Sequence, residues 1–514
     1  MVLNKKFMTA EEAVSLIPDD ATLSITGGGG GLCEAMLLQE AIETRFLETG
    51  HPKNMTLIHA LGIGNRQGSG VGRFAHSGMV RKVIGGHWVW SPKMQDMAAK
   101  NEIEAYVLPG GVAMQLMREI AAGRPGLITH VGLGTFIDPR VDGGRMNEAA
   151  KDPICEVMTI GDREYLRYLP FPIHACLLKG SIADDEGNIS LDEEPANVDT
   201  YAIAAAVHNS GGKVIFQVRD RVPAGTLGAR EVRIPAAIVD AIVVDPDQTQ
   251  GYEITYDPSI SGQSRIKLDP PIAPEFSARR IIANRAKEEL VEGAIINYGF
   301  GIPDEIATIV AAENKQNLYF QTIEHGTYGG RLLTGSLFGY AQNASSMIDG
   351  PSQFDFYGGG GLDIAFLGFG QIDQCGNVNA SKLGGLPVGP GGFIDIAQNA
   401  RKVVFVGTFD AKGTKVSSGN GKLTVHQNGA IAKFVEKVDQ ITFAGEQAAL
   451  RGQEVIYVTE RAVFRLTANG IALTEVAPGV CVEKDVLKCM SFTPTIDSKV
   501  EMDKRHFMSD ELVS

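Results

Sequence analysis

The sequence predicts an α/β protein made of two related open α/β domains. Short β-rich runs alternate with helical patterns along the chain: the run 22–26 precedes a predicted helix over 33–46, and the runs 213–218 and 402–406 are also β-rich. Such alternation is typical of largely parallel sheets connected by helices. A chain of 514 residues is too long for one core and fits two domains of about 250 residues.

A proline cluster predicts where the domains divide. The pattern breaks over 268–274 (LDPPIAP), and a new helical pattern begins at about Ser277. We therefore predict an N-terminal domain over 1–270 and a C-terminal domain over 276–514.

The two halves resemble each other in sequence. Residues 177–190 (LLKGSIADDEGNIS) align with 366–379 (FLGFGQIDQCGNVN), and at the same offset 213–216 (KVIF) falls on 402–405 (KVVF). Further upstream, 15–36 resembles 289–306 at a larger offset, so the first half carries an insertion between the two matching blocks. Two similar α/β domains predict an active-site cleft between them.

Composition and charge exclude several classes of partner. A net charge of −14 and a pI near 5.3 disfavour nucleic acid and anionic membranes, which are bound through excess Lys and Arg. The six cysteines are scattered without a C-x-x-C pair, so they predict neither a disulfide framework nor a zinc site. The N-terminal residues lack the apolar region of a signal peptide, and no apolar run approaches a membrane span. We expect a cytoplasmic protein.

Glycine clusters mark candidate anion-binding turns. The segments 27–31 and 299–303 each follow a predicted strand and precede a predicted helix, an arrangement that leaves backbone N–H groups for an anion or oxyanion. A purely structural turn explains them equally well. Both lack the final glycine of a dinucleotide fingerprint, and the chain contains no P-loop motif.

The C-terminal half contains further glycine runs, over 357–363 and 388–395, and an isolated carboxylate, Glu324, in TIEHGTYGG (322–330). An acid after a hydrophobic strand is most often a solvated loop residue. The ten histidines show no metal-ligand spacing, so we expect no metal site, and the absence of G-x-S-x-G disfavours a serine hydrolase.

Five segments together resemble a known family. They are GHWVWSP (86–92), GLGTFIDPR (132–140), TIEHGTYGG (322–330), SQFDFYGGGGLD (352–363) and GGFIDIAQNA (391–400). In this order, across most of the chain, they are similar to segments of the single-chain bacterial family I CoA-transferases, in the propionate and acetate:acetoacetate CoA-transferase group. The resemblance implies that the two halves correspond to the fused α and β subunits of two-subunit relatives.

The resemblance also implies roles for individual residues. Glu324 matches the catalytic glutamate, Gly391 and Gly392 match the oxyanion-binding glycine, and Gln353 is a candidate contact to the thioester carbonyl. The matching CoA-binding loop is Gly299, Phe300, Gly301, Ile302 and Pro303, and the acyl pocket is expected to include Gly28, Gly29, Gly30, His325 and Tyr328.

His325 departs from the family, which generally has a small residue after the glutamate. A titratable ring there either reshapes the acyl pocket or adds a proton donor, or it points away and only packs. The departure leaves the preferred acid open.

The chemistry requires only a carboxylate. A CoA-transferase exchanges a thioester between two carboxylic acids, and an ionised glutamate can enter that exchange as one more acid. We therefore predict ping-pong transfer of CoA between a short-chain acyl-CoA and a free carboxylate, such as acetate, propionate, butyrate or acetoacetate, through a glutamyl-CoA thioester. No cofactor beyond the substrate coenzyme A is expected, and relatives imply a homo-oligomer, a homotetramer.

Alternative functions remain at this point. An acyl-CoA hydrolase would let water intercept the intermediate, and a non-catalytic acyl-CoA-binding protein would have no need of Glu324. The same general fold also includes sugar-phosphate isomerases and deaminases, in which a carboxylate is a base.

Overall fold

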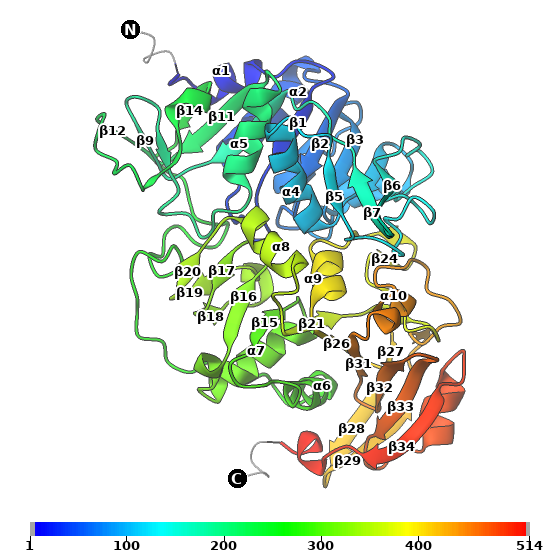
Figure 1. Ribbon diagram of the computed structural model, residues 1–514. Helices are drawn as coiled ribbons and strands as arrows, with labels where there is room; N and C mark the ends of the chain where they lie inside the picture. Colours follow the sequence, from blue (N-terminus) through cyan, green and yellow to red (C-terminus); the bar gives the residue numbers. More distant parts are fainter. Residues whose placement is uncertain (1–5, 510–514) are drawn as a thin grey trace. The chain divides into compact units, whose positions relative to one another are not determined.

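The computed structural model describes residues 6–509, which divide into two compact units (Figure 1). The first unit contains the chain up to Lys267 together with Ile323–Phe356 and Gly384–Asp395; the second contains Leu268–Thr322, Tyr357–Leu383 and the chain from Ile396 onwards. The predicted domains, 1–270 and 276–514, were divided at the proline cluster in the sequence, whereas these units are defined by packing. The two divisions differ at the two segments that the first unit takes from the C-terminal half.

The first unit is built on a seven-stranded parallel sheet in the order β14-β11-β8-β1-β2-β3-β4. Its strands are β1 Thr22–Ile25, β2 Met55–His59, β3 Val80–Gly85, β4 Glu104–Val107, β8 Ala175–Lys179, β11 Lys213–Val218 and β14 Ala241–Val244. Every residue of β2 and β8 is buried. Burial on both faces explains why these strands are nearly continuous apolar runs in the sequence.

Helices and smaller sheets complete this unit. The helices are α1 Ala10–Ser15, α2 Met36–Thr49, α3 Pro92–Ala99, α4 Gly110–Ala121 and α5 Thr200–Asn209, with α8 Gly350–Gly358 beginning in it. Helices α4 and α5 pack against each other (Figure 1). One small sheet is antiparallel, β5 Leu127–Thr129, β7 Arg163–Tyr168 and β6 Cys155–Ile160, and another contains β12 Asp220–Val222, β9 Ile182–Asp184, β10 Ile189–Ser190 and β13 Val232–Ile234. Short pairs join β17 Thr327–Tyr328 to β20 Ser346–Met347 and β18 Arg331–Leu332 to β19 Ala341–Gln342.

The second unit contains parallel strands in the order β16-β15-β21-β26-β31, followed by antiparallel β32 and β33 and then β34, which is parallel to β33. The strands are β15 Ile295–Tyr298, β16 Phe320–Ile323, β21 Ile364–Gly368, β26 Lys402–Val406, β31 Glu454–Val458, β32 Ala462–Thr467, β33 Gly470–Val476 and β34 Thr495–Glu501. The helices are α6 Ala278–Lys287, α7 Ile302–Ala312, α9 Phe393–Asn399, which begins in the first unit, and α10 Gly445–Leu450. The remaining short strands of this unit are β22 Gln371–Ile372, β23 Val378–Asn379, β24 Lys382–Leu383, β27 Asp410–Ala411, β28 Lys415–Gly419, β29 Lys422–Gln427 and β30 Ile431–Ala432, and β25 Leu386–Pro387 belongs to the first unit.

The internal similarity predicted from sequence is a structural repeat. In each unit three central strands lie in the same parallel order, β1-β8-β11 in the first and β15-β21-β26 in the second. The turn after the middle strand also recurs. Asp184 accepts hydrogen bonds from the backbone N–H groups of Gly187 and Asn188, and Asp373 accepts them from those of Cys375 and Asn377.

Helix boundaries differ from the sequence-based expectation at one place. The helix predicted over 33–46 begins at Met36, because Cys33 has a positive φ of 55° and cannot belong to a right-handed helix. The helix predicted from Ser277 is confirmed: Ser277 is the N-cap of α6, and its side chain accepts from the Arg280 N–H. Within the described residues, no helix has the length and apolar character needed to cross a membrane.

Candidate active site

Glu324 directly follows β16 in a tight turn. The Gly326 N–H donates to the carbonyl oxygen of Ile323 at 3.0 Å, and Gly326 has a φ of 112°. A side chain at position 326 would collide with the backbone oxygen of Ile348. The turn therefore needs glycine, and it holds the half-buried Glu324 in place instead of leaving it on a solvated loop.

Gly392 contacts the Glu324 carboxylate. Its backbone N–H hydrogen bonds to the carboxylate, and a Cβ atom at position 392 would overlap Oε2 of Glu324 and lie 3.1 Å from the Phe354 ring. Residues predicted from two distant motifs are thus brought together in the first unit.

The surroundings change the titration of this carboxylate. Burial raises the pKa of Glu324 to about 7, and the hydrogen bond from Gly392 opposes the rise. A carboxylate near neutrality is a better nucleophile than an ordinary solvated one, because basicity and nucleophilicity increase together once water is removed.

We expect the rate of acyl transfer to Glu324 to follow this pKa. Only the ionised carboxylate can attack, so kcat/KM for acyl-CoA should fall about tenfold per pH unit below about 7. Initial rates of acyl-CoA formation with propionyl-CoA as donor and acetate as acceptor, measured between pH 5.5 and 8.5, give the profile. A rate that stays constant between pH 6 and 8 would contradict the assignment.

The loop 388–392 is fixed to the N-terminal half of the chain. The Gly391 N–H donates to Gly86 O at 3.0 Å, the Trp88 N–H to Val388 O at 2.8 Å, and the Gly110 N–H to Gly391 O at 2.7 Å. Because the Gly391 N–H already donates to Gly86 O, it is not free for an oxyanion, which favours Gly392 of the two glycines that the sequence left as alternatives. Of the two candidate glycines, only Gly392 has its N–H on Glu324.

Gln353 lies on α8 with a fully buried side chain. Neither its Oε1 nor its Nε2 has a hydrogen-bond partner. Burial raises the pKa of Tyr328, and a contact between its phenol and the Gln353 side chain opposes that rise, although this contact lacks the geometry of a hydrogen bond. An unpaired buried amide is costly, so its presence beside this segment is a signal of ligand binding.

Replacing Gln353 should lower the activity and raise the stability of the protein. In Gln353→Leu we expect kcat/KM to fall roughly tenfold or more, while the free energy of unfolding rises by about 1–3 kcal/mol because two unpaired polar atoms are removed. Gln39 offers a matched control, since its side chain is also buried with both amide atoms unpaired. Gln39→Leu should raise the thermal midpoint without changing activity; equal activity of both variants would exclude a substrate contact by Gln353.

His325 is buried and points its ring toward the backbone of Gly339, to whose oxygen Nε2 lies at 2.7 Å. Burial lowers the pKa of His325 to about 4, so the ring is neutral at pH 7 and its Nε2 proton is held by Gly339. This geometry favours the packing role. Leu32 lies beside the same glycine, which connects His325 to the N-terminal glycine block.

The glycine block 27–31 is a packing element. The Gly28 N–H donates to Leu32 O at 2.8 Å and the Gly30 N–H to Gly64 O at 3.3 Å. The prediction that these amides are free at a helix N-terminus is therefore wrong for both, because the chain turns back on itself before α2 begins. A Cβ at Gly29 would enter the Trp90 ring, so close packing explains that glycine.

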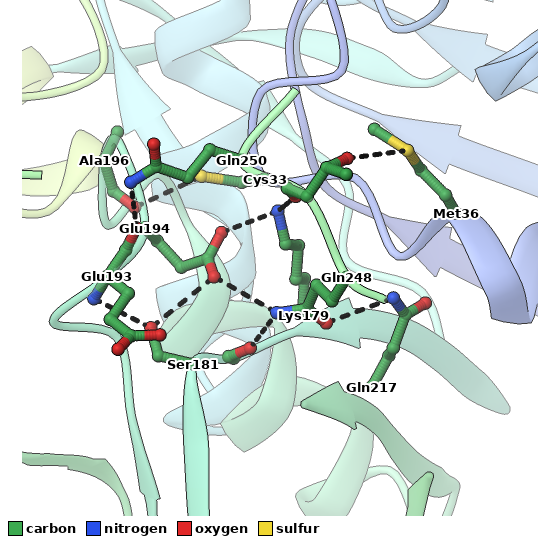
Figure 2. A network of polar contacts seen from close by, with 12 residues as sticks. Cys33, Met36, Lys179, Ser181, Glu193, Glu194, Ala196, Gln217, Gln248 and Gln250 are labelled. Atoms are coloured by element: carbon green, nitrogen blue, oxygen red, sulfur yellow. Dashed lines mark hydrogen bonds and ion pairs between the residues drawn. The ribbon is translucent and has the colours of Figure 1, made fainter. Parts of the chain in front are cut away.

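A buried ionic network supports this block (Figure 2). The Lys179 ammonium lies 2.9 Å from Oε2 of Glu194 and donates to Thr249 O at 2.6 Å. The Gln217 amide oxygen accepts from the Leu37 N–H at the start of α2. The segment after Thr249 then reaches the glycine block, where the Tyr252 N–H donates to Gly30 O at 2.9 Å. No motif in the sequence indicated this network.

The predicted CoA-binding loop, Gly299 to Pro303, belongs to the second unit. Gly301 is the N-cap of α7 with a φ of 98°, and its N–H donates to the Asp304 carboxylate at 3.1 Å. The Gly301 N–H is therefore not free to bind an anion, contrary to that expectation for this turn. Phe300 is 48% exposed, and the space beside the Gly301 Cα is open.

Asp395 lies within the motif GGFIDIAQNA, but no sequence pattern marked it as a functional residue. Asp395 is buried, and burial raises its pKa to about 8, with Glu324 contributing to the rise. Two carboxyls with raised pKa values, the half-buried Glu324 and the buried Asp395, thus lie near each other. Across residues 6–509, no group of three or more His, Cys, Asp or Glu residues is placed to hold a metal ion.

The fold and this site define an α/β enzyme of the group-transfer class. The family model for coenzyme A transferases matches residues 7–245. The chain is 40% identical over 503 residues to an acetate CoA-transferase, YdiF, of Escherichia coli O157:H7, covering 98% of this chain and 95% of the relative. It is 41% identical over 515 residues to a caffeate CoA-transferase of Acetobacterium woodii, covering 98% and 97% of the two chains.

A solved structure agrees with these relatives. The crystal structure of the acyl-CoA transferase YdiF from E. coli O157:H7, a thioester complex with CoA, matches with a TM-score of 0.93 and 40% identity, over 98% of this chain and 96% of that one. The chain belongs to the coenzyme A transferase family. It is a CoA-transferase, an enzyme that transfers CoA to a carboxylate.

Proposed function

We propose that this enzyme exchanges CoA between a short-chain acyl-CoA and a free carboxylate through a glutamyl-CoA thioester on Glu324. The observation that carries the proposal is the half-buried carboxylate itself, with a pKa of about 7 and a backbone N–H from Gly392 on it. The thioester state described for the E. coli relative supports a covalent route.

The proposed cycle needs only carboxylates and the CoA thiolate. Glu324 attacks the acyl-CoA carbonyl, the C–S bond breaks, and an acyl-glutamyl anhydride and CoA thiolate form. The thiolate then attacks the glutamyl carbonyl, releasing the first carboxylate and leaving the glutamyl-CoA thioester. A second carboxylate reverses both steps, so a new acyl-CoA leaves and Glu324 is again a carboxylate. Each tetrahedral step develops an oxyanion that a fixed N–H can stabilise.

Individual roles follow from the positions of the residues. Gly392 is the proposed oxyanion and carboxylate donor, and Gln353 the contact to the thioester carbonyl. His325, Tyr328 and Gly28 to Gly30 are proposed to bound the acyl pocket, although Gly28 and Gly30 act through packing. Phe300 and the surrounding loop 299–303 are proposed to contact CoA through side chains more than through backbone N–H groups.

We propose that the free carboxylate that accepts CoA is a short-chain acid. The acetate specificity named for the E. coli relative favours acetate, and propionate, butyrate and acetoacetate belong to the same proposal. Because one relative is a caffeate CoA-transferase, an aromatic acid is the acceptor to compare with acetate. We also propose that the enzyme acts without a metal or redox cofactor, since no step changes oxidation state, and that it is a cytoplasmic homotetramer with fused α-like and β-like halves.

Transfer kinetics test the proposal. With propionyl-CoA as donor and acetate as acceptor, double-reciprocal plots at several acetate concentrations should be parallel, and thiol should not accumulate. Thiol release at the same rate with and without acetate would instead establish hydrolysis. Binding without either reaction would indicate a non-catalytic acyl-CoA-binding protein, and turnover of phosphosugars would indicate the isomerase alternative.

A further inference from the structure

The first turn of α4 is bound entirely by the chain around Gly392. A helix begins with N–H groups that have no partner within the helix. In α4 the Gly110 N–H donates to Gly391 O at 2.7 Å, the Gly111 N–H to Oδ2 of Asp395 at 3.1 Å, and the Val112 N–H to Oδ1 of Asp395 at 3.1 Å. Both oxygens of one buried carboxylate are thus used to hold a helix that is distant in sequence.

These bonds fix Gly392 from both sides. Gly391, the residue before it, is held by Gly110 and by Gly86 O, and Asp395, three residues after it, is held by Gly111 and Val112. Gly392 itself has no side chain with which to hold its own position. The placement of its N–H on Glu324 therefore depends on the two anchors.

Steric contacts couple the same residues. A Cβ at Gly111 would lie 2.6 Å from Oδ1 of Asp395 and would overlap the Phe354 ring, and a Cβ at Gly392 would lie 3.1 Å from that ring. The Phe354 ring is 1% exposed. The helix start, the carboxylate, the ring and the glycine are therefore packed without room for displacement.

We infer that Asp395 is a positioning residue for the acyl-transfer step: by binding the first turn of α4, it sets the Gly392 N–H on the Glu324 carboxylate. The inference rests on the proposed role of Glu324. A helix cap with no catalytic consequence is the competing explanation.

Asp395 interacts electrostatically with other titratable groups of the first unit. Besides Glu324, the Tyr168 phenol is electrostatically coupled to it, and that phenol donates to Val131 O at 2.8 Å. Neither group is a cation, and the backbone N–H bonds from α4 favour the ionised form of Asp395.

Asp395→Asn tests the inference, because an amide can accept only one of the two N–H bonds. Single-turnover formation of the CoA thioester on Glu324, followed by intact mass with propionyl-CoA, should slow roughly 30- to 100-fold. The Kd for desulfo-CoA, which cannot react, should change less than threefold. Asp184→Asn is the matched control, since Asp184 is also buried and accepts backbone N–H bonds; it should form thioester at the wild-type rate.

A second variant keeps the test decisive if Asp395→Asn does not fold. Gly111→Ala retains the Asp395 carboxylate but displaces it, so it should also slow thioester formation at least tenfold. Gly72→Ala is the control: Gly72 is buried with open space around it, and this variant should form thioester at the wild-type rate. Thioester formation within threefold of wild type in folded Asp395→Asn or Gly111→Ala would overturn the inference, as would equal losses in desulfo-CoA affinity and rate. If wild type itself formed no thioester, the proposed function would fail instead.

Discussion

Glu324→Gln should abolish the CoA adduct and lower transfer activity by roughly 10⁴-fold or more. The amide has nearly the same shape but cannot form an anhydride or a thioester with CoA. Intact mass after incubation with acetyl-CoA or propionyl-CoA measures the adduct, and borohydride should reduce it in the wild type. Peptide mapping should place the modification on Glu324.

Another glutamate with a raised pKa provides the control. Glu34 is fully buried, and burial raises its pKa to about 7, but its carboxylate is bound by the Gly64 N–H and the Tyr252 hydroxyl. Glu34→Gln should retain the adduct. An adduct that persisted in Glu324→Gln and disappeared in Glu34→Gln would place the nucleophile elsewhere.

The same substitution should stabilise the fold above neutral pH. The pKa of Glu324 is raised from 4.5 in the unfolded reference to about 7 in the folded protein, so the folded state binds the proton more tightly. Stability is therefore lost as pH rises from about 4.5 to 7, by an upper bound of about 3 kcal/mol. We expect Glu324→Gln to unfold at a higher temperature than wild type at pH 8, and the difference to shrink toward pH 5.

Gly392→Ala should slow thioester formation by roughly 10²- to 10³-fold. The added methyl group would overlap Oε2 of Glu324, so either the carboxylate or the loop must move. The backbone N–H is still present in this variant, and the effect therefore reports its position. Single-turnover mass spectrometry with propionyl-CoA measures the rate.

Gly72→Ala again separates this effect from a general cost of adding a methyl group, because Gly72 is buried but has no neighbour within 4 Å of the new atom. Its rate should equal that of wild type. A Gly392→Ala enzyme within tenfold of wild type would show that the contact with Glu324 can relax at little cost.

The sequence by itself determined the α/β class and the repeat, and its resemblance to the CoA-transferases indicated Glu324 as the candidate nucleophile. Parallel strands buried on both faces must be apolar along their length, so runs such as 213–218 and 402–406 are visible directly as β11 and β26. The repeated Asp-x-x-Gly-Asn turn is visible because its carboxylate must cap nearby backbone N–H groups. Glu324 was indicated by the resemblance of five segments taken together, one of which contains the glycine at 326 that the turn requires.

Only the tertiary structure decided which N–H groups are available and which residues hold them. Glycines at 28, 30, 301 and 391 looked equivalent to Gly392 in sequence, yet their N–H groups are bound by Leu32, Gly64, Asp304 and Gly86. Asp395 could not be recognised, because its partners Gly111 and Val112 are more than 280 residues away in the chain. Hydrogen-bond partners and raised pKa values arise from groups that folding brings together. Local sequence patterns therefore do not predict them.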